Sequence, residues 1–356
     1  MFSKSSDSHK PDKKIRVLIV EDSPLICKIL TKIFNTDEEI EVAGIANDGK
    51  KAVEYAMSLK PDIITMDINL PIMNGFEATK KIMAYAPTPI LIVSSSLYTV
   101  EMNLAFKAIS FGALDVVEKG PMETQDNIDK FGKTIVEKIK LLSKVKVITH
   151  PEAKIADIGL RTTKTFKEEL AGNKIVGIVS STGGPKALLD VITGLPDDFK
   201  FPVVIVQHIV PGFTSGLIDW LQSESGKKIS LASGGSVVQP GQIYIAPENY
   251  HTQILHDGRI HLLATPPYQG HKPSGNILLR SLADSYGPNS IGVILTGMGS
   301  DGCEGLMEIR RKGGRTLAQD EVTSIVYGMP KVAFETGAAE KIFPIEKIGQ
   351  EIIKLI

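Results

Sequence analysis

Five polar or charged residues follow short apolar runs in the first third of the chain, and their types suit phosphoryl transfer. Glu21 and Asp22 end one run, and Asp67 ends another. Carboxylates that lie close together repel unless a cation lies among them, and their oxygens suit Mg²⁺, which takes few protein ligands. Ser94 and Lys119 end or follow two further runs. They could hold the oxygens of a phosphoryl group that Asp67 has attacked.

Each of these residues also has an ordinary structural interpretation. An acid at the end of a strand is commonly a helix cap, and a single lysine after a strand is commonly solvated. The whole set, at successive positions of one strand and helix cycle, favours a site over five unrelated side chains.

A second set of residues in the latter half of the chain could perform nucleophilic catalysis. Ser181 follows the apolar run KIVGIVSS and precedes TGGPKALL, in which the paired glycines permit a tight turn. A helix that begins there would stabilise negative charge at its N-terminus. His208 ends the next strand and Asp301 follows a later one. His208 would accept the proton of Ser181, and Asp301 would orient the imidazole.

Other interpretations of this second set remain open from the residues alone. Ser181 could be a helix N-cap, His208 a hydrogen-bonded core histidine, and Asp301 the cap of the helix that follows it. The chain order differs from that of α/β-hydrolases, and no G-x-S-x-G motif is present. Triads are defined by geometry, so the order excludes nothing.

The segment GMGSDG at 297–302 offers a rival function. It matches G-x-G-x-x-G after a strand, and Asp320 follows at about the distance of a ribose ligand. A dinucleotide site is therefore an alternative. Against it, such a fingerprint belongs in the first strand-to-helix turn of its domain, whereas this one comes late.

The elements that position both sets alternate between strands and helices. Residues 15–22 (IRVLIVED) suit a strand buried on both faces, and Ser23 and Pro24 predict the start of a helix. Five such pairs predict a doubly wound parallel sheet of the flavodoxin-like (βα)5 type. The remaining expected strands lie near 40–46, 62–67, 89–94 and 114–118, and the last helix spans about 123–144.

The rhythm stops at 145–172, a charged and Thr-rich segment that we interpret as a linker. It resumes as a second α/β domain, doubly wound and mostly parallel, that contains short strands over 228–263 and a hairpin turn at 256–259. The expected elements of this domain are strands at 174–181, 201–208, 290–297 and 315–320 and a helix at 303–312. The domains are 1–14, a disordered tail; 15–144; the linker 145–172; and 173–356.

Composition narrows the function further. The 356 residues include 40 basic and 41 acidic ones, a net charge of −1, which disfavours nucleic-acid binding. Cys27 and Cys303 fall in different domains, so a disulfide framework is not expected. No stretch reads as a signal peptide or a membrane span. We expect a cytoplasmic monomer that does not insert into membranes.

Residues 15–140 resemble the receiver domain of two-component response regulators, through VLIVEDS, PDIITMDINLPIMNG, PILIVSS and GALDVVEKG. The resemblance implies that Asp67 is the phospho-acceptor and that Glu21, Asp22 and Asp67 hold Mg²⁺. It also implies that Ser94 and Lys119 are the switch hydroxyl and the phosphate-binding lysine. Receivers usually have Lys-Pro where this chain has Lys119-Gly120-Pro121.

Residues 174–356 resemble the catalytic domain of CheB protein-glutamate methylesterases, through SSTGGPKAL, VQHIVPGFT, YIAPENYH, HKPSGN, LTGMGSDG and AQDEVTSIVYGMP. The resemblance implies a triad of Ser181, His208 and Asp301. Backbone N–H groups after Ser181, at Thr182, and at Met298 would form the oxyanion hole. Two departures are visible, because the family usually has Gly-Ala where Val179-Ser180 stand and an aspartate where Asn276 stands.

By this resemblance the substrate is the glutamate γ-methyl ester on the cytoplasmic helices of chemoreceptors. A Ser181 acyl-enzyme would release methanol and then be hydrolysed, and glutamine deamidation would use the same residues. A histidine kinase would supply the phosphoryl group to Asp67 and so regulate the esterase, and the esterase reaction itself would need no cofactor. His251 and His271 are interpreted as pocket or surface residues without a metal role. The alternative of another class is a non-enzymatic response regulator that binds receptor helices.

Overall fold

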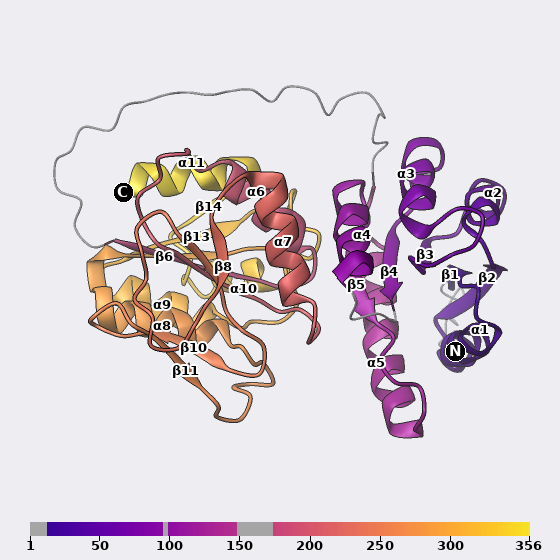
Figure 1. The fold of residues 1–356 in the computed structure, drawn as a ribbon, viewed down its shortest axis with the longest axis horizontal. Coiled ribbons are helices and arrows are strands. Elements are labelled where there is room, and N and C mark those ends of the chain that lie inside the picture. The colour runs from indigo at the N-terminus through magenta and orange to yellow at the C-terminus, as the bar shows by residue number, and fades with distance from the viewer. Residues whose placement is uncertain (1–12, 95–98, 148–173) are drawn as a thin grey trace, which may run out of the picture. The chain divides into compact units, whose positions relative to one another are not determined.

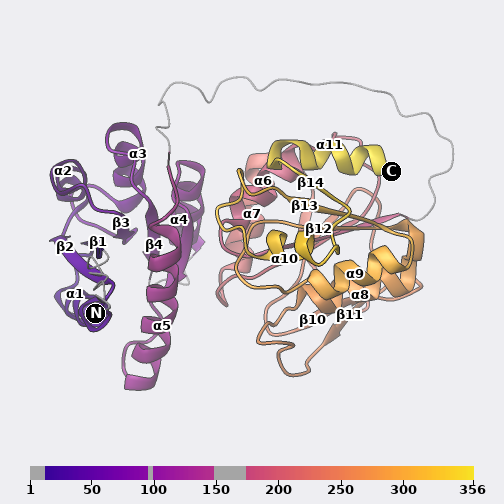
Figure 2. The same ribbon diagram turned by 180° about the vertical axis from the view of Figure 1, so that it is seen from behind.

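The computed structural model describes residues 13–94, 99–147 and 174–356, which form two compact units (Figure 1, and from behind in Figure 2). Most of the predicted tail at 1–14 and of the predicted linker at 145–172 lies outside the described residues. Each unit is a parallel sheet covered by helices, as the alternating pattern predicts. No described helix is long and apolar enough to cross a membrane.

The first unit is built on a five-stranded parallel sheet in the order β2-β1-β3-β4-β5. The flavodoxin-like prediction is therefore confirmed. The strands are β1 (Ile15–Val20), β2 (Ile40–Ala46), β3 (Ile63–Met66), β4 (Ile90–Ser94) and β5 (Asp115–Glu118). The helices that alternate with them along the chain are α1 (Pro24–Thr36), α2 (Gly49–Leu59), α3 (Gly75–Tyr85), α4 (Thr99–Ser110) and α5 (Gln125–Leu142).

The local sequence explains where these elements begin. Leu18 and Ile19 in β1 are fully buried, as expected for a strand covered on both faces. Ser23 is the N-cap of α1, its side chain accepts a hydrogen bond from the Ile26 backbone N–H, and Pro24 is the first helical residue. Proline fits there because the first N–H groups of a helix have no partner within it. The predicted start of α1 is thus confirmed.

The second unit is built on a sheet of seven parallel strands in the order β14-β13-β12-β6-β7-β9-β8. Two more strands, β10 and β11, form a separate antiparallel hairpin across the turn predicted at 256–259. The strands are β6 (Ile175–Ser180), β7 (Val203–Gln207), β8 (Ile229–Leu231), β9 (Ile243–Ile245), β10 (His251–Ile254), β11 (Ile260–Leu263), β12 (Ser290–Ile294), β13 (Arg315–Gln319) and β14 (Lys341–Phe343).

Helices cover both faces of this sheet (Figure 1). The helices α6, α7 and α11 lie together on one face, and α8 and α9 pack against each other on the other. The helices are α6 (Gly184–Thr193), α7 (Thr214–Ser225), α8 (Gly275–Tyr286), α9 (Cys303–Arg311), α10 (Met329–Glu335) and α11 (Ile345–Leu355).

The strand β6 marks the point at which the chain reverses its direction of travel across the sheet. From β6 the chain proceeds to β7, β8 and β9 on one side, and it returns to β12, β13 and β14 on the other. In open α/β sheets, ligands bind beyond the carboxyl ends of the strands at such a point. The fold therefore directs attention to the residues that follow β6, β7 and β12.

Candidate functional site

The five polar or charged residues of the first set gather at the carboxyl edge of the first sheet. The Lys119 Nζ atom lies 2.6 Å from Glu21 Oε2 and 2.8 Å from Asp67 Oδ2. Carboxylate oxygens of Glu21, Asp22 and Asp67 lie within 4.8 Å of one another. Ser94 accepts a backbone hydrogen bond from the Lys119 N–H at 2.8 Å. The sequence grouping of these residues is thus reproduced in space.

The carboxylates at this edge of the sheet suit a cation, and Lys119 suits an anion. Burial raises the pKa values of Glu21 and Asp67, and attraction to Lys119 offsets only part of that effect. Burial would lower the pKa of Lys119, but the charges of Asp67 and Glu21 raise it overall. The two buried carboxylates of Glu21 and Asp67 share Lys119, and the exposed Asp22 lies beside them. This set of hard oxygen donors fits Mg²⁺.

The inserted residue Gly120 does not displace the lysine. Gly120 adopts φ +60, in the left-handed region, and a Cβ atom there would meet nothing within 4 Å. Lys119 still reaches both carboxylates. The departure from Lys-Pro changes the turn after β5 and leaves the ion pairs in place.

The second set lies just beyond the carboxyl ends of three neighbouring strands. Ser180 in β6 is paired in register with Gln207 in β7, so the next residues, Ser181 and His208, leave the sheet side by side. Asp301 follows β12, the neighbour of β6 on its other side. The strand order thus places all three residues at one edge.

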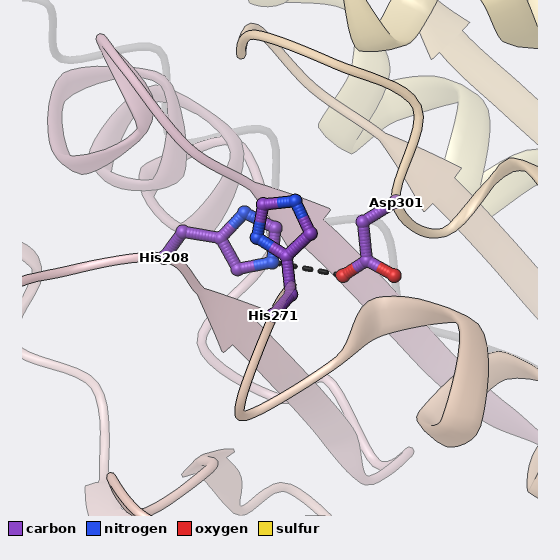
Figure 3. A group of neighbouring side chains, drawn as sticks. All are labelled: His208, His271 and Asp301. Carbon is purple, nitrogen blue, oxygen red and sulfur yellow. Dashed lines mark hydrogen bonds and ion pairs between the residues drawn. The ribbon is translucent and has the colours of Figure 1, made fainter. Parts of the chain in front are cut away.

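His208 and Asp301 are in direct contact (Figure 3). The His208 Nε2 atom lies 2.8 Å from Asp301 Oδ2. Burial alone would raise the pKa of Asp301, but hydrogen bonds from His208, Ser274 and Gly275 lower it to about 2. An ionised carboxylate only accepts hydrogen bonds, so Nε2 is the ring nitrogen that carries the proton. The other nitrogen, Nδ1, is buried and has no hydrogen-bond partner among the residues that the structure describes, which leaves it as an acceptor.

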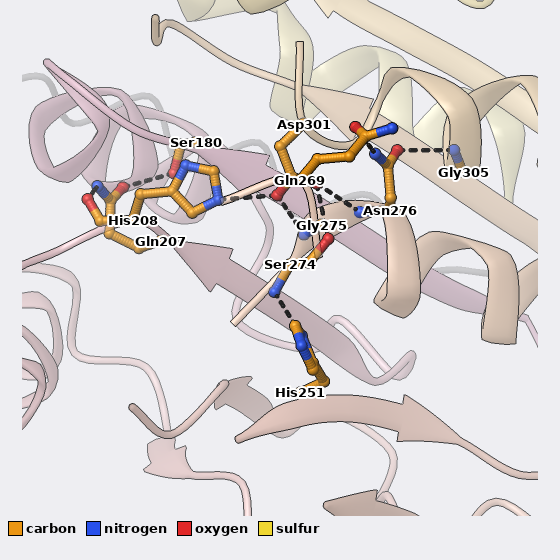
Figure 4. A network of polar contacts seen from close by, with 10 residues as sticks. All are labelled: Ser180, Gln207, His208, His251, Gln269, Ser274, Gly275, Asn276, Asp301 and Gly305. Atoms are coloured by element: carbon orange, nitrogen blue, oxygen red, sulfur yellow. Dashed lines mark hydrogen bonds and ion pairs between the residues drawn. The ribbon is translucent and has the colours of Figure 1, made fainter. Parts of the chain in front are cut away.

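Asp301 is also the acceptor for the first turn of α8 (Figure 4). It accepts hydrogen bonds from the Ser274 hydroxyl at 2.7 Å, the Gly275 N–H at 2.6 Å and the Asn276 N–H at 3.1 Å. The first N–H groups of a helix have no partner within the helix, and a carboxylate is favoured at that end. Asp301 therefore caps α8, which precedes it in the chain, whereas the N-cap of α9, the helix that follows it, is Gly302.

Ser180, the residue beside Ser181, lies inside the sheet. It is fully buried, and its hydroxyl donates to Gln207 Oε1 at 2.6 Å. The Gln207 Nε2 group donates to the backbone carbonyls of Ser181 and His208, each at 2.8 Å. Gln207 thus ties together the two strand ends that carry Ser181 and His208. Ser181 is the half-buried hydroxyl of the pair.

The glycines after Ser181 are required by this arrangement. A Cβ atom on Gly184 would lie 2.0 Å from Gln207 Oε1, and Gly183 adopts φ +76. Only glycine adopts that conformation without strain and lets the backbone approach so closely. The helix α6 therefore begins immediately beyond Ser181, as the sequence predicts.

The residues predicted for the oxyanion hole flank Ser181. Thr182 follows it in the chain, and the Thr182 carbonyl accepts a hydrogen bond from the Thr296 hydroxyl at 3.0 Å. The Ser181 N–H donates to the Thr296 carbonyl at 3.0 Å. A Cβ atom on Gly297 would lie 2.6 Å from Ser181 Cβ, so Met298 comes from a backbone pressed against Ser181. The oxyanion hole at Thr182 and Met298 stays a prediction.

Asn276 is fully buried and joins two helices. Its Oδ1 atom accepts a hydrogen bond from the Gly305 N–H in the first turn of α9 at 3.0 Å, and its Nδ2 group donates to Gln269 Oε1 at 3.4 Å. An aspartate could accept the same bond from Gly305. The packing of α8 on α9 therefore explains why an acceptor stands at this position and is compatible with asparagine or aspartate.

Two histidines have places that the sequence did not distinguish. His251 is fully buried; its Nδ1 atom accepts from the Ser274 N–H at 3.1 Å, and its Nε2 atom lies 3.0 Å from the Pro266 carbonyl. It is a core residue, and the surface interpretation is wrong for it. His271 stacks on His208, with ring centroids 4.3 Å apart. Burial and the neighbouring His208 lower the pKa of His271.

The dinucleotide alternative fits this geometry poorly. The segment 297–302 follows β12, which is not the first strand of its sheet, and its Asp301 is committed to His208 and α8. Asp320, the predicted ribose ligand, accepts hydrogen bonds from the Thr323 N–H and hydroxyl at 3.0 and 2.6 Å. Both acids already have partners within the protein.

Comparison with known proteins assigns both parts of the chain to families. Residues 176–352 match the CheB methylesterase family, and residues 17–129 match the response regulator receiver domain. The chain is 40% identical to protein-glutamate methylesterase/protein-glutamine glutaminase 1 of Syntrophus aciditrophicus, over 96% of this chain and 98% of that protein. It is 37% identical to the protein-glutamate methylesterase/protein-glutamine glutaminase of Pyrococcus horikoshii, over 97% of this chain and 94% of that protein.

A solved structure extends the comparison to the second unit. The crystal structure of the Thermotoga maritima CheB methylesterase catalytic domain aligns with a TM-score of 0.50 and 39% identity, covering 52% of this chain and 100% of that one. The fold and the matches define a hydrolase that carries a response regulator receiver domain. The chain belongs to the CheB methylesterase family.

Proposed function

We propose that this protein hydrolyses the γ-methyl esters of glutamate side chains on chemoreceptor helices, with Ser181 as nucleophile and His208 as base. One observation carries the mechanism. The Nε2 atom of His208 is held by ionised Asp301, while Nδ1, at the strand end beside Ser181, is buried and has no hydrogen-bond partner in the described part of the chain. A buried acceptor without a donor is costly, and a serine hydroxyl that approached it would supply that donor.

The reaction proceeds in two balanced steps. The Ser181 oxygen attacks the ester carbonyl carbon as its proton passes to His208 Nδ1, and the imidazolium is stabilised by Asp301. The backbone N–H groups of Thr182 and Met298 would stabilise the oxyanion. The intermediate expels methoxide, which takes the proton from His208 and leaves as methanol. Water then gives a proton to His208 and attacks the acyl-enzyme, and the intermediate expels the Ser181 oxygen, which takes that proton back from His208 as glutamate is released.

The same residues would deamidate receptor glutamines, as the double name of the relatives suggests. The leaving group is then ammonia in place of methanol, and His208 supplies the proton that the departing nitrogen needs. The product is again a glutamate. Both reactions consume one water for each side chain.

We further infer that phosphorylation of Asp67 by a histidine kinase raises the esterase rate. Glu21, Asp22 and Asp67 would hold Mg²⁺ through their oxygens. The cation would neutralise negative charge as the phosphoryl group is transferred. Asp67 would attack phosphorus, and Lys119 would exchange a carboxylate partner for a phosphoryl oxygen. The Ser94 hydroxyl would bond another phosphoryl oxygen.

Methanol release from methyl-labelled receptor fragments tests both parts. The wild type, Ser181→Ala and Asp67→Asn proteins would be compared with and without a small phosphodonor and Mg²⁺. We expect Ser181→Ala to release no methanol above background. The ratio of the rates with and without phosphodonor should exceed one in the wild type and equal one in Asp67→Asn. Release by Ser181→Ala at the wild-type rate would reject the mechanism, and stimulation of Asp67→Asn would reject the regulation.

A further inference from the structure

A second imidazole lies face to face with the proposed catalytic base (Figure 3). The ring centroids of His208 and His271 are 4.3 Å apart and their planes differ by 12°. The hydrogen bond to Asp301 fixes His208 at one atom, Nε2. A ring held at Cβ and at one nitrogen can still swivel about the line that joins them. Contact with a flat neighbour restricts that swivel and so fixes the direction in which Nδ1 points.

His271 is presented by a tight turn with its own support. The Tyr268 and His271 backbones exchange two hydrogen bonds of 3.0 Å, with Gln269 at φ 49 and Gly270 at φ 85 between them. Two central residues with positive φ define a compact two-residue turn. The position of the imidazole is therefore set by the backbone of this turn.

The Tyr268–His271 turn is anchored to the start of α9 through Glu304. The Tyr268 hydroxyl and the Gln269 amide donate to the two Glu304 carboxylate oxygens at 2.9 and 2.7 Å. Arg280 pairs with the same carboxylate and lies over the Tyr268 ring, 5.2 Å from its centroid. Asp301 and Glu304 lie three residues apart in the chain. The residue that binds His208 and the residue that anchors the His271 turn therefore belong to the same short segment.

The residues after His271 are anchored as well. The Ser274 N–H donates to buried His251, and the Ser274 hydroxyl donates to Asp301 (Figure 4). The loop that carries His271 is thus anchored on both sides. Before His271 it is bound to Glu304, and after His271 it is bound through Ser274 to His251 and Asp301. A side chain supported in this way is suited to positioning a reactive neighbour.

We propose that His271 is a positioning residue for the esterase reaction, whose ring holds His208 in the orientation that accepts the Ser181 proton and stabilises the imidazolium that results. The proposal rests on the function proposed above. A neutral aromatic face attracts a cation placed against it, so the stack strengthens when His208 is protonated. The stabilisation is then larger in the transition state than in the resting enzyme, which is the condition for raising kcat.

A metal ion is the other occupant that these side chains could be thought to bind. Ligand atoms of His208, His271 and Asp301 lie within 4.8 Å of one another. A ligating nitrogen directs its lone pair in the plane of its ring, however, and the two planes here are nearly parallel. Their lone pairs do not converge at the roughly 2.0–2.1 Å that Zn²⁺ requires. The stack therefore favours positioning over metal binding.

The test compares His271→Ala, which removes the ring, with His271→Phe, which retains a flat face and no ring nitrogen. His261→Ala, at an exposed histidine on β11, is the matched control. For each full-length protein, kcat and KM are measured on the methylated receptor fragment. The rate at which a small fluorophosphonate inactivates Ser181 is measured as well, because it reports activation of the serine without receptor binding.

We expect His271→Ala to lose about tenfold or more in kcat, because small misplacements of reacting groups are costly. Fluorophosphonate inactivation should slow in parallel, while KM changes little. His271→Phe should recover both rates to within about threefold of the wild type, since a phenyl face also stacks on a cation. Thermal unfolding of each variant verifies that the second unit is folded.

Three results would overturn the proposal. These are an unchanged kcat in folded His271→Ala, a loss confined to KM, and a His271→Phe variant as slow as His271→Ala. The last would show that a ring nitrogen, not the ring face, is what matters. Failure of the underlying function is distinguishable, because Ser181→Ala would then retain methanol release. A positioning role alone fails when Ser181 is essential and the ring of His271 is not.

Discussion

The Ser274 hydroxyl donates to Asp301 Oδ1 at 2.7 Å, while Oδ2 of the same carboxylate lies 2.8 Å from His208 Nε2. Asp301 therefore meets the first turn of α8 and the imidazole at the same time, and its Oδ2 atom is shared between the Gly275 N–H and His208. The N-terminus of α8 contributes two backbone N–H groups to the same acid. The orientation of His208 thus depends on α8, because Asp301 binds both the imidazole and the start of that helix.

Ser274→Ala should weaken both the capping of α8 by Asp301 and the hold of Asp301 on His208. Hydrogen bonds to charged groups contribute about 1.5–3 kcal/mol, so we expect the free energy of unfolding of the second unit to fall by about that amount. The esterase kcat should fall as well, because Asp301 would be less firmly held. Urea unfolding and methanol release measure the two effects. Ser233→Ala, at an exposed serine, is the control, and equal stability of the two variants would contradict the expectation.

The stability of the second unit should depend on acid pH through Asp301. The folded pKa of this group is about 2, below its usual 3.8, so its contribution is present above pH 3.8 and is lost as the pH falls toward 2. The contribution is about 2 kcal/mol. The gap in unfolding free energy between wild type and Asp301→Asn should therefore narrow between pH 6 and pH 3. A gap that stayed constant across this range would count against the assignment.

Gly184 and Gln207 should behave as a coupled pair. Gly184→Ala would place a Cβ atom 2.0 Å from Gln207 Oε1, and overpacking of this kind costs about 1–3 kcal/mol. Gln207→Ala removes the obstacle, so the double variant should lose less stability than the sum of the single losses. Unfolding of all three variants measures the coupling. Gly234→Ala is the control, because its Cβ atom would meet nothing nearer than 3.5 Å, and strict additivity would contradict the prediction.

Asn276→Asp should leave substrate affinity unchanged. The side chain is fully buried and bonds the Gly305 N–H, so it does not face a substrate. An aspartate would retain that bond at the N-terminus of α9, where negative charge is favoured. We expect KM to change by less than about twofold, since uniform substrate binding is untouched. A large increase in KM on the receptor fragment would instead indicate a substrate contact.

The sequence predicted those parts of the fold and site that depend on strand ends. The apolar runs located β1, β6 and β7, and parallel strands bring their carboxyl ends to one edge. Ser181 and His208 could therefore be placed beside each other before any coordinates were known. Their roles, with the oxyanion hole, remain predictions, as do the domain boundaries in residues outside the described ranges.

The sequence could not predict the supports of the site. Gln207 reads as one more residue in a strand, and its three hydrogen bonds depend on the register with Ser180. His271 lies in a loop whose position is set by Glu304 and His251, residues distant in the chain. Such contacts follow from tertiary packing and carry no local periodicity.

The shared duty of Asp301 has a practical consequence for anyone who wants an inert form of this enzyme that still captures its target. Replacement of the acid would remove the cap of α8 along with the partner of His208, so a loss of capture could reflect a loosened domain. The Ser181 hydroxyl caps no helix among the described residues, so removing it would not loosen one. A trap for the receptor complex is therefore better made at the nucleophile than at the acid.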